Sequence, residues 1–219
     1  MNRRYALGVI GAAAVAGGAF TLTNRTGGLP ELGAAYAAGA EADTSGILEM
    51  TMGAVDAPIT LVEYASFTCP HCANFHNGPL KQLKADYIET DKVRFIYRDV
   101  YFDRFGLWAS MIARCDTNRF FGISDLLYND QKSWIGSGDP SEIAENLRKI
   151  GRIAGLTNEQ LETCLSDNDN AKALVAWYEE NSTRDEVTST PTLIIDGDKH
   201  SNMTYAELQT ILDKKLGME

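Results

Sequence analysis

The feature that most constrains this chain is a pair of cysteines, Cys69 and Cys72, separated by two residues. The residues before the pair, 59–67, are mostly β-branched, aliphatic or aromatic, which predicts a buried strand. The residues after it, 73–87, carry apolar side chains near helical spacing, and Pro79 is expected to kink that helix. A dithiol at such a strand-to-helix junction can close to a disulfide and open again, so the pair predicts a fold and a chemistry together.

The expected position of Cys69 favours a reactive thiolate. Cys69 would lie at the N-terminus of the helix, where unpaired N–H groups and the helix dipole stabilise negative charge. Pro70 suits the first helical turn, because the N–H that it lacks would have had no partner there. A protonated His71 and hydrogen bonds from the next turn would stabilise the thiolate further, which predicts a low thiol pKa. Cys72 is expected to be the buried, less reactive partner.

A static disulfide or half of a zinc site would also account for two cysteines at this spacing. No second C-x-x-C follows, however, and no pair of histidines stands at zinc-finger spacing. The formal net charge of −10 at pH 7 argues against a nucleic-acid partner and is typical of a solvated acidic surface. The sequence therefore favours a redox-active dithiol that needs neither a cofactor nor a metal.

The N-terminus has the layout of an export signal. Arg3 and Arg4 are followed by an uncharged run over residues 5–22, whose length would permit a membrane span. Possible small-residue cleavage sites lie downstream, at 35–37 and 38–40, so the segment could be removed or kept as a tether. Export predicts an oxidising compartment, in which disulfides form and persist.

The remaining patterns predict a mixed fold that is interrupted by helices. Strand character at 46–52 and 92–100, together with the motif, gives the order β-β-α-β. From 103 to about 181 every pattern is helical and includes two capping boxes, which begin at Asp139 and Thr157. Strand character returns at 192–195 and near 199–202, before a final amphipathic helix that Thr204 is expected to cap. Since neither flank makes a stable sheet alone, the helical region must leave and rejoin one sheet.

Two stretches resemble the DsbA-like thiol–disulfide oxidoreductases of the bacterial periplasm, of the alphaproteobacterial type. They are residues 62–72, Val-Glu-Tyr-Ala-Ser-Phe-Thr-Cys-Pro-His-Cys, and residues 189–192, Ser-Thr-Pro-Thr. The element order extends the likeness over about 46–216. Two positions depart from the family pattern: Thr190 stands where some members have valine, and Ser189 stands where glycine is common.

The resemblance implies an α/β fold, namely a thioredoxin fold with an inserted all-helical domain. It divides the chain into a signal peptide or membrane anchor (1–22), a linker (23–45), the first part of the thioredoxin domain (46–102), the inserted helical domain (103–183) and the second part of the thioredoxin domain (184–219).

The resemblance also implies roles for residues around the dithiol. Glu63 matches a buried acid that exchanges protons with the inner cysteine, Cys72; a strand-edge acid that reaches solvent or a salt bridge is the alternative. Pro191 matches a cis-proline that faces the dithiol, and Thr190 would pair with an extended substrate segment, although an ordinary trans-proline would also fit. His76 is expected to be only a packing or surface residue.

Cys115 and Cys164 fall in two predicted helices of the insertion. In an oxidising compartment they are expected to form a structural disulfide, which would stabilise the fold by about 4 kcal/mol on the loop-entropy model. Two buried free thiols are the alternative.

The expected activity is that of a periplasmic oxidase. A stabilised Cys69 thiolate would make the Cys69–Cys72 disulfide an oxidant, which reduced or unfolded exported proteins would attack to give a mixed disulfide. The resemblance implies a DsbB-like, quinone-linked membrane reoxidase, and we expect a monomer that is soluble after signal cleavage or tethered to the inner membrane by residues 5–22.

Two other activities stay open at this point. One is an isomerase or reductase of the same fold, although residues 23–45 look too short for the dimerising arm that isomerases generally need. The other is a copper-binding module that would use Cys69, Cys72 and His71, with Met50 or Met52 as a further ligand.

Overall fold

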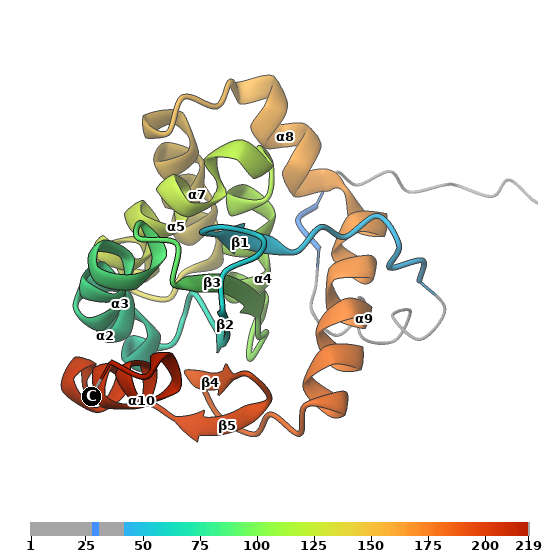
Figure 1. Cartoon of the computed structure of the whole chain (residues 1–219). Helices are drawn as coiled ribbons and strands as arrows, with labels where there is room; N and C mark the ends of the chain where they lie inside the picture. The colour runs from blue at the N-terminus through green and yellow to red at the C-terminus, as the bar shows by residue number, and fades with distance from the viewer. Residues whose placement is uncertain (1–27, 31–41, 219) are drawn as a thin grey trace, which may run out of the picture.

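The computed structural model describes residues 28–30 and 42–218 (Figure 1). The predicted signal or anchor at 1–22 and most of the predicted linker lie outside the described residues. Within the described ranges, no helix combines the length and the apolar character that crossing a membrane requires.

A five-stranded sheet lies at the centre of the molecule (Figure 1), in the order β1-β3-β2-β4-β5. Strands β2 and β3 are parallel, and every other neighbouring pair is antiparallel. The strands are β1 (Met50–Met52), β2 (Ile59–Ala65), β3 (Val93–Asp99), β4 (Thr192–Ile195) and β5 (Asp198–Ser201). The mixed fold and the helical insertion predicted from the sequence are thereby confirmed.

Strand β2 is the middle strand and is buried along nearly its whole length. Its run of aliphatic and aromatic side chains suits a strand that is covered on both faces. After the insertion, the chain returns to β2 through β4, whose Ile194 and Leu193 pair with Val62 and Glu63. Because β2 and β4 are antiparallel, this pairing brings the segment just before β4 next to the C-terminal end of β2, where the motif begins.

The helix predicted over 73–87 is divided into three pieces. They are α2 (Pro70–Asn77), α3 (Pro79–Leu83) and a π-helical turn (Lys84–Ile88), in which the N–H of Glu89 bonds the carbonyl of Lys84 at 2.9 Å. The break falls at Gly78, because Pro79 cannot donate to the preceding turn and instead starts a new helix. The C-terminal helix, α10 (Tyr205–Leu216), contacts α3 and β2.

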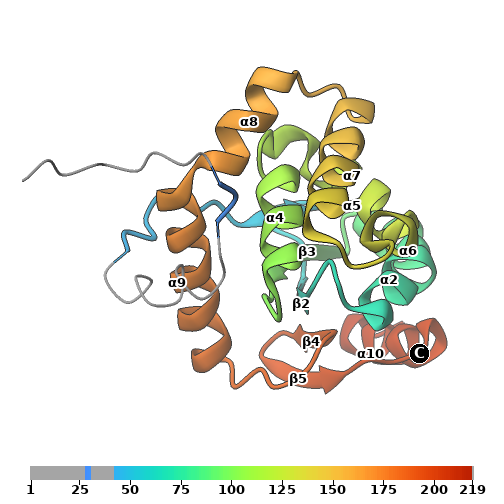
Figure 2. The ribbon, with the colours of Figure 1, turned by 180° about the vertical axis from the view of Figure 1, so that it is seen from behind.

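The insertion is entirely helical between β3 and β4. Most of its helices lie together on the β1 and β3 side of the molecule, and the last one, α9 (Asn168–Arg184), runs back along the side towards β4 and β5 (Figures 1 and 2). They are α4 (Arg104–Ala113), a 3-10 turn (Thr117–Arg119), α5 (Phe120–Asn129), α6 (Gln131–Ile135), α7 (Pro140–Ile153), α8 (Asn158–Ser166) and α9 (Asn168–Arg184). One apolar core includes side chains of both the sheet and the insertion, so neither part packs separately.

Helix caps explain most of the helix starts. Thr157 begins α8 with a complete capping box, and Thr204 does the same for α10, as the sequence predicts. The capping box predicted at Asp139 is only half correct. Asp139 accepts hydrogen bonds from the first turn of α7, but the carboxylate of Glu142 accepts one from Ser137 at 2.7 Å. The short helix α6 was not predicted, since five residues are too few to show a period.

Candidate active site

The dithiol lies at the junction between β2 and α2. Cys69 is the N-cap of α2 in an extended conformation, and Pro70 is the first helical residue. Both cysteines carry free thiols and are buried: Cys69 is 8% exposed and Cys72 is 0% exposed. Pro70 and His71 are exposed and form the outer surface of the motif.

Hydrogen bonds lower the pKa of the Cys69 thiol to about 5. The largest contribution is the hydrogen bond with the Cys72 thiol, and burial opposes it. The Thr190 side chain and the main-chain N–H groups of Cys72 and His71 lower the pKa further. His71 therefore contributes through its backbone at the helix N-terminus, which is the anion-stabilising feature that the motif predicts.

The two sulfur atoms have opposite proton affinities. The pKa of the Cys72 thiol is raised, first by burial, then by its hydrogen bond to Cys69 and by the negative charge of Glu63. At neutral pH the dithiol thus holds a thiolate on Cys69 and a proton on Cys72. This asymmetry separates a nucleophile from a proton-bearing partner within one helical turn.

Below the dithiol lies a buried ionisable pair. The carboxylate of Glu63 is 0% exposed, and its Oε2 lies 2.8 Å from Nε2 of His76, which is 2% exposed. The other oxygen, Oε1, has no hydrogen-bond partner among the described residues. The expectation that His76 is a packing or surface residue is incomplete. The ring is buried and packs against Tyr97 and Tyr128, but it is also paired with the acid. Its position seven residues after Cys69, two helical turns on, was the available signal.

A loop from the far side of the insertion covers Cys69. The Thr190–Pro191 peptide bond is cis, and the carbonyl oxygen of Thr190 lies 3.6 Å from Sγ of Cys69, which donates to it. The Thr190 hydroxyl is buried without another hydrogen-bond partner in the described part of the chain. A thiolate on Cys69 is an acceptor for that hydroxyl, which agrees with the lowering of the Cys69 pKa by the Thr190 side chain.

The insertion holds the loop before α2 from the other side. Nε2 of Gln131, a buried residue at the start of α6, donates to the carbonyl oxygens of Phe67 at 2.8 Å and Cys69 at 3.0 Å. The hydroxyl of Thr68 donates to Oδ2 of Asp103 at 2.7 Å, and Asp103 also caps α4. The sequence analysis missed Gln131 because no local pattern marks a glutamine that acts over more than sixty residues.

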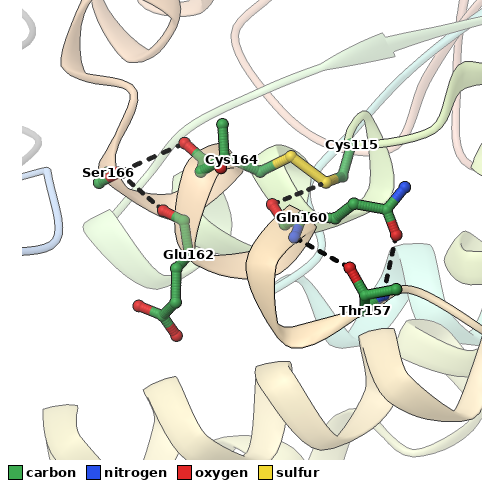
Figure 3. Close-up of a disulfide and its surroundings, with 7 residues drawn as sticks. Cys115, Thr157, Gln160, Glu162, Cys164 and Ser166 are labelled. Carbon is green, nitrogen blue, oxygen red and sulfur yellow. Dashed lines mark hydrogen bonds between the residues drawn. A yellow bond between two sulfur atoms is a disulfide. The ribbon is translucent and has the colours of Figure 1, made fainter.

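Cys115 and Cys164 form a disulfide with a Cα–Cα distance of 5.7 Å (Figure 3). Cys115 follows α4, and Cys164 belongs to α8, so the bond joins residues 49 apart in sequence. Nearby, the N–H of Gln160 bonds Oγ1 of Thr157 at 3.2 Å, and the N–H of Thr157 bonds Oε1 of Gln160 at 2.8 Å. The bond thus ties the end of one helix of the insertion to a well-capped neighbour.

The described residues contain no group of three or more His, Cys, Asp and Glu side chains that is arranged to hold a metal ion. Of the residues considered as copper ligands, Met50 is buried in β1, which pairs with β3, whereas His71 is exposed on α2.

Comparisons with known proteins agree with this geometry. The thioredoxin family model matches residues 46–214. A protein of Rickettsia bellii, provisionally named protein-disulfide oxidoreductase, is 32% identical over 170 residues. The match covers 77% of this chain and 64% of that protein, so the chain spans less than two thirds of its relative.

Solved structures show the same fold. Alpha-DsbA1 of Wolbachia pipientis superposes with a TM-score of 0.72 at 24% identity, covering 82% of this chain and 96% of that one. A protein-disulfide isomerase of Novosphingobium aromaticivorans gives a TM-score of 0.69 at 26% identity, covering 76% and 97%.

Proposed function

Because the chain belongs to the thioredoxin family, we propose that it is a protein-disulfide oxidoreductase that donates its Cys69–Cys72 disulfide to exported proteins. The observation that carries this proposal is the asymmetry of the two thiols: the pKa of Cys69 is about 5, whereas that of Cys72 is raised. Stabilising the thiolate stabilises the reduced protein. Its disulfide is therefore easier to reduce and acts as an oxidant of other thiols.

The reaction is two successive thiol–disulfide exchanges. A substrate thiolate attacks Sγ of Cys69 in the oxidised protein, the bond to Cys72 breaks, and the Cys72 sulfur leaves with the electron pair. A second thiolate of the substrate then attacks the mixed disulfide and releases Cys69 as a thiolate. The substrate loses two electrons and gains a disulfide, and the protein gains a dithiol.

Glu63 is proposed to supply and accept the proton of Cys72. The raised pKa of Cys72 means that its sulfur must take up a proton soon after it leaves the disulfide. Glu63 is buried with Cys72 in the same core, and its charge contributes to that raised pKa. A carboxyl group that can gain and lose a proton there acts as a general acid and base.

Thr190 and Pro191 are proposed to bind the substrate chain. The cis peptide brings the Thr190 carbonyl beside the nucleophile, where an extended segment could add to it as a short β-strand. Pro70 and His71 are exposed at the same end of α2 and are proposed to meet the substrate from its other side. This arrangement would recognise the main chain of a substrate more than its side chains, which suits a wide range of unfolded substrates.

The proposed place of action is the bacterial periplasm. The basic start and the apolar run over residues 5–22 support export, and the disulfide between Cys115 and Cys164 suits an oxidising compartment. The proposed partners are reduced exported proteins and a DsbB-like, quinone-linked reoxidase in the membrane. The protein is proposed to work as a monomer, either free after cleavage or tethered.

A second candidate is a disulfide isomerase of the same fold, which the name of the Novosphingobium structure favours. The redox equilibrium with glutathione separates the two. We expect a Cys69–Cys72 pair more oxidising than about −270 mV, the value typical of a dithiol whose nucleophile has a pKa near 7. A value at or below that potential would contradict the oxidase. Recovery of activity from scrambled ribonuclease without added oxidant would instead support an isomerase.

A further inference from the structure

Glu63 and His76 are both ionisable, and such side chains are rarely buried as completely as these two are. Both side chains are nearly inaccessible, and one carboxylate oxygen, Oε1, has no partner among the described residues. Burying a charged or unpaired polar group costs several kcal/mol unless the surroundings repay it. A pair kept at that cost beneath a reactive dithiol needs an explanation beyond packing.

A pocket of about 260 Å³ has His76, but not Glu63, in its lining. His76 and two other buried side chains, Leu80 and Ser124, line its inner part. Its outer part is made of exposed residues, among them Lys84 of the π-helical turn and Asp125 of α5. The imidazole therefore stands between the buried carboxylate and a cavity large enough to hold several waters.

The imidazole of His76 contacts both the acid and the pocket. Its Nε2 is hydrogen-bonded to Oε2 of Glu63, and His76 is also part of the pocket lining. An imidazole can take a proton at one nitrogen while it releases one from the other. The ring is therefore placed to pass a proton between the carboxylate and water in the pocket.

Resting on the function proposed above, we propose that His76 is the relay through which Glu63 exchanges protons with solvent each time Cys72 gains or loses its own proton. When the Cys69–Cys72 disulfide is reduced, Cys72 leaves with an electron pair and takes a proton from Glu63. His76 then returns a proton to Glu63 and takes one from water in the pocket. When an external disulfide reoxidises the protein, the Cys72 proton leaves by the reverse route.

Other ionisable groups around His76 do not offer this route. Tyr97 of β3 and Tyr128 of α5 pack against the imidazole, but their hydroxyls bond each other at 2.7 Å. Burial raises the pKa of both tyrosines well above 10, so they stay protonated. At the outer part of the pocket, the charged side chains Lys81, Lys84, Glu89 and Asp125 are exposed and set only the local field.

The test measures the step that depends on the Cys72 proton separately from the chemistry of Cys69. His76→Gln keeps an amide N–H that can reach Glu63 but cannot carry a proton, and His76→Ala opens the pocket. We expect reduction of the disulfide by dithiothreitol, followed by stopped flow between pH 5 and 9, to slow at least about tenfold in both variants. Alkylation of Cys69 in the reduced protein should change less than about twofold. Added imidazole should restore the rate of His76→Ala in a saturable way.

Ser124→Ala is the matched control, because Ser124 lines the same pocket but cannot exchange protons at neutral pH. We expect it to react like the wild type. Glu63→Gln should be slowed at least as much as His76→Gln, and the double variant should be slowed no further, because both residues act in one route. The relay is overturned if His76→Gln matches the wild type, if Ser124→Ala is equally slow, or if imidazole has no effect.

The wild type alone also decides the question if the His76 variants do not fold. The pH profile of the reduction rate should have an inflection at the midpoint of the His76 titration, measured by NMR from the imidazole signals. A profile that does not follow that midpoint overturns the relay. Each of these results would overturn the relay alone. The proposed function would fail only if the wild-type protein did not transfer its disulfide to a reduced protein.

Discussion

The chain contains two pairs of cysteines, one present as free thiols and the other as a disulfide. Cys69 and Cys72 share one turn of α2 and carry free thiols. Cys115 and Cys164 are 49 residues apart, join the end of α4 to α8, and are bonded. The free pair is buried, whereas the bonded pair is only half-buried.

The comparison shows that exposure does not decide which pair holds a thiol of low pKa. Cys69 is nearly inaccessible, yet it receives hydrogen bonds from the Cys72 thiol and from main-chain N–H groups, and its pKa falls to about 5. Cys115 and Cys164 share a disulfide and therefore have no thiol proton to lose. The reactivity of a thiol follows from which groups stabilise its anion. The stabilisation that a disulfide gives to the fold follows from how long a loop it closes.

The largest effect on disulfide donation is expected when one sulfur of the Cys69–Cys72 pair is removed. Cys69→Ser should abolish disulfide donation, because no nucleophile or electrophilic sulfur remains at the helix N-terminus. Cys72→Ser should instead accumulate mixed disulfides, because nothing can resolve them from within the protein. Incubation with a substrate peptide that carries a disulfide, followed by non-reducing electrophoresis, measures both. A Cys69→Ser variant that still forms a mixed disulfide would contradict the assignment of the nucleophile.

The next largest effect is expected at the bonded pair. Cys115→Ala with Cys164→Ala should lower the free energy of unfolding by about 4 kcal/mol on the loop-entropy model, because the unfolded chain gains conformational freedom. The pKa of Cys69 and the rate of disulfide donation should stay close to the wild type. Denaturant unfolding and peptide oxidation measure these separately. If the double variant lost donation while it remained folded, the two pairs would not be independent.

A smaller effect sharpens the account of the thiolate. Thr190→Val removes a hydroxyl that has no other partner among the residues that the structure describes and that lowers the pKa of Cys69. We expect the Cys69 pKa to rise by about one to two units, since hydrogen bonds to charged groups are worth about 1.5–3 kcal/mol and one pKa unit is about 1.4 kcal/mol. The disulfide should become less oxidising in the same proportion. Thr188→Val, at an exposed position in the same loop, is the control and should change neither quantity.

The smallest expected effect lies at the contact between the insertion and the active-site loop. Gln131→Leu removes the two hydrogen bonds to the carbonyls of Phe67 and Cys69. We expect a loss of about 1–3 kcal/mol of stability, because two buried carbonyls lose their partner. Gln82→Leu, an exposed position on α3, is the matched control. Equal stability of Gln131→Leu and the wild type would show that this contact does not hold the loop.

Local sequence patterns were enough to predict many of the strands and helix starts. The run of β-branched and aliphatic residues places β4 at 192–195 with the observed bounds, and the Thr157 and Thr204 boxes mark two helix starts correctly. Cys69 at the N-cap follows from the strand-to-helix change at one position. These features depend on neighbours within a few residues, which a single sequence reveals.

The parts that escaped prediction depend on distant contacts. Gln131 acts on a loop 62 residues away, and nothing in its own neighbourhood indicates that role. His76 became meaningful only when its ring was seen against Glu63, because a histidine inside an apolar helix face usually serves for packing. The break at Gly78 is a third case, since Pro79 predicted a kink where the chain starts a new helix.

The titration of the Cys69 thiol in the reduced wild-type protein tests the central claim most directly. Absorbance of the thiolate near 240 nm, corrected with Cys69→Ser, and the rate of alkylation by iodoacetamide should follow one curve. Because the pKa is lowered from 9.0 to about 5, both signals should be constant above about pH 6.5 and fall only as the pH drops through 5. A signal that declines steadily below pH 8 would contradict the claim that the surroundings hold Cys69 as an anion.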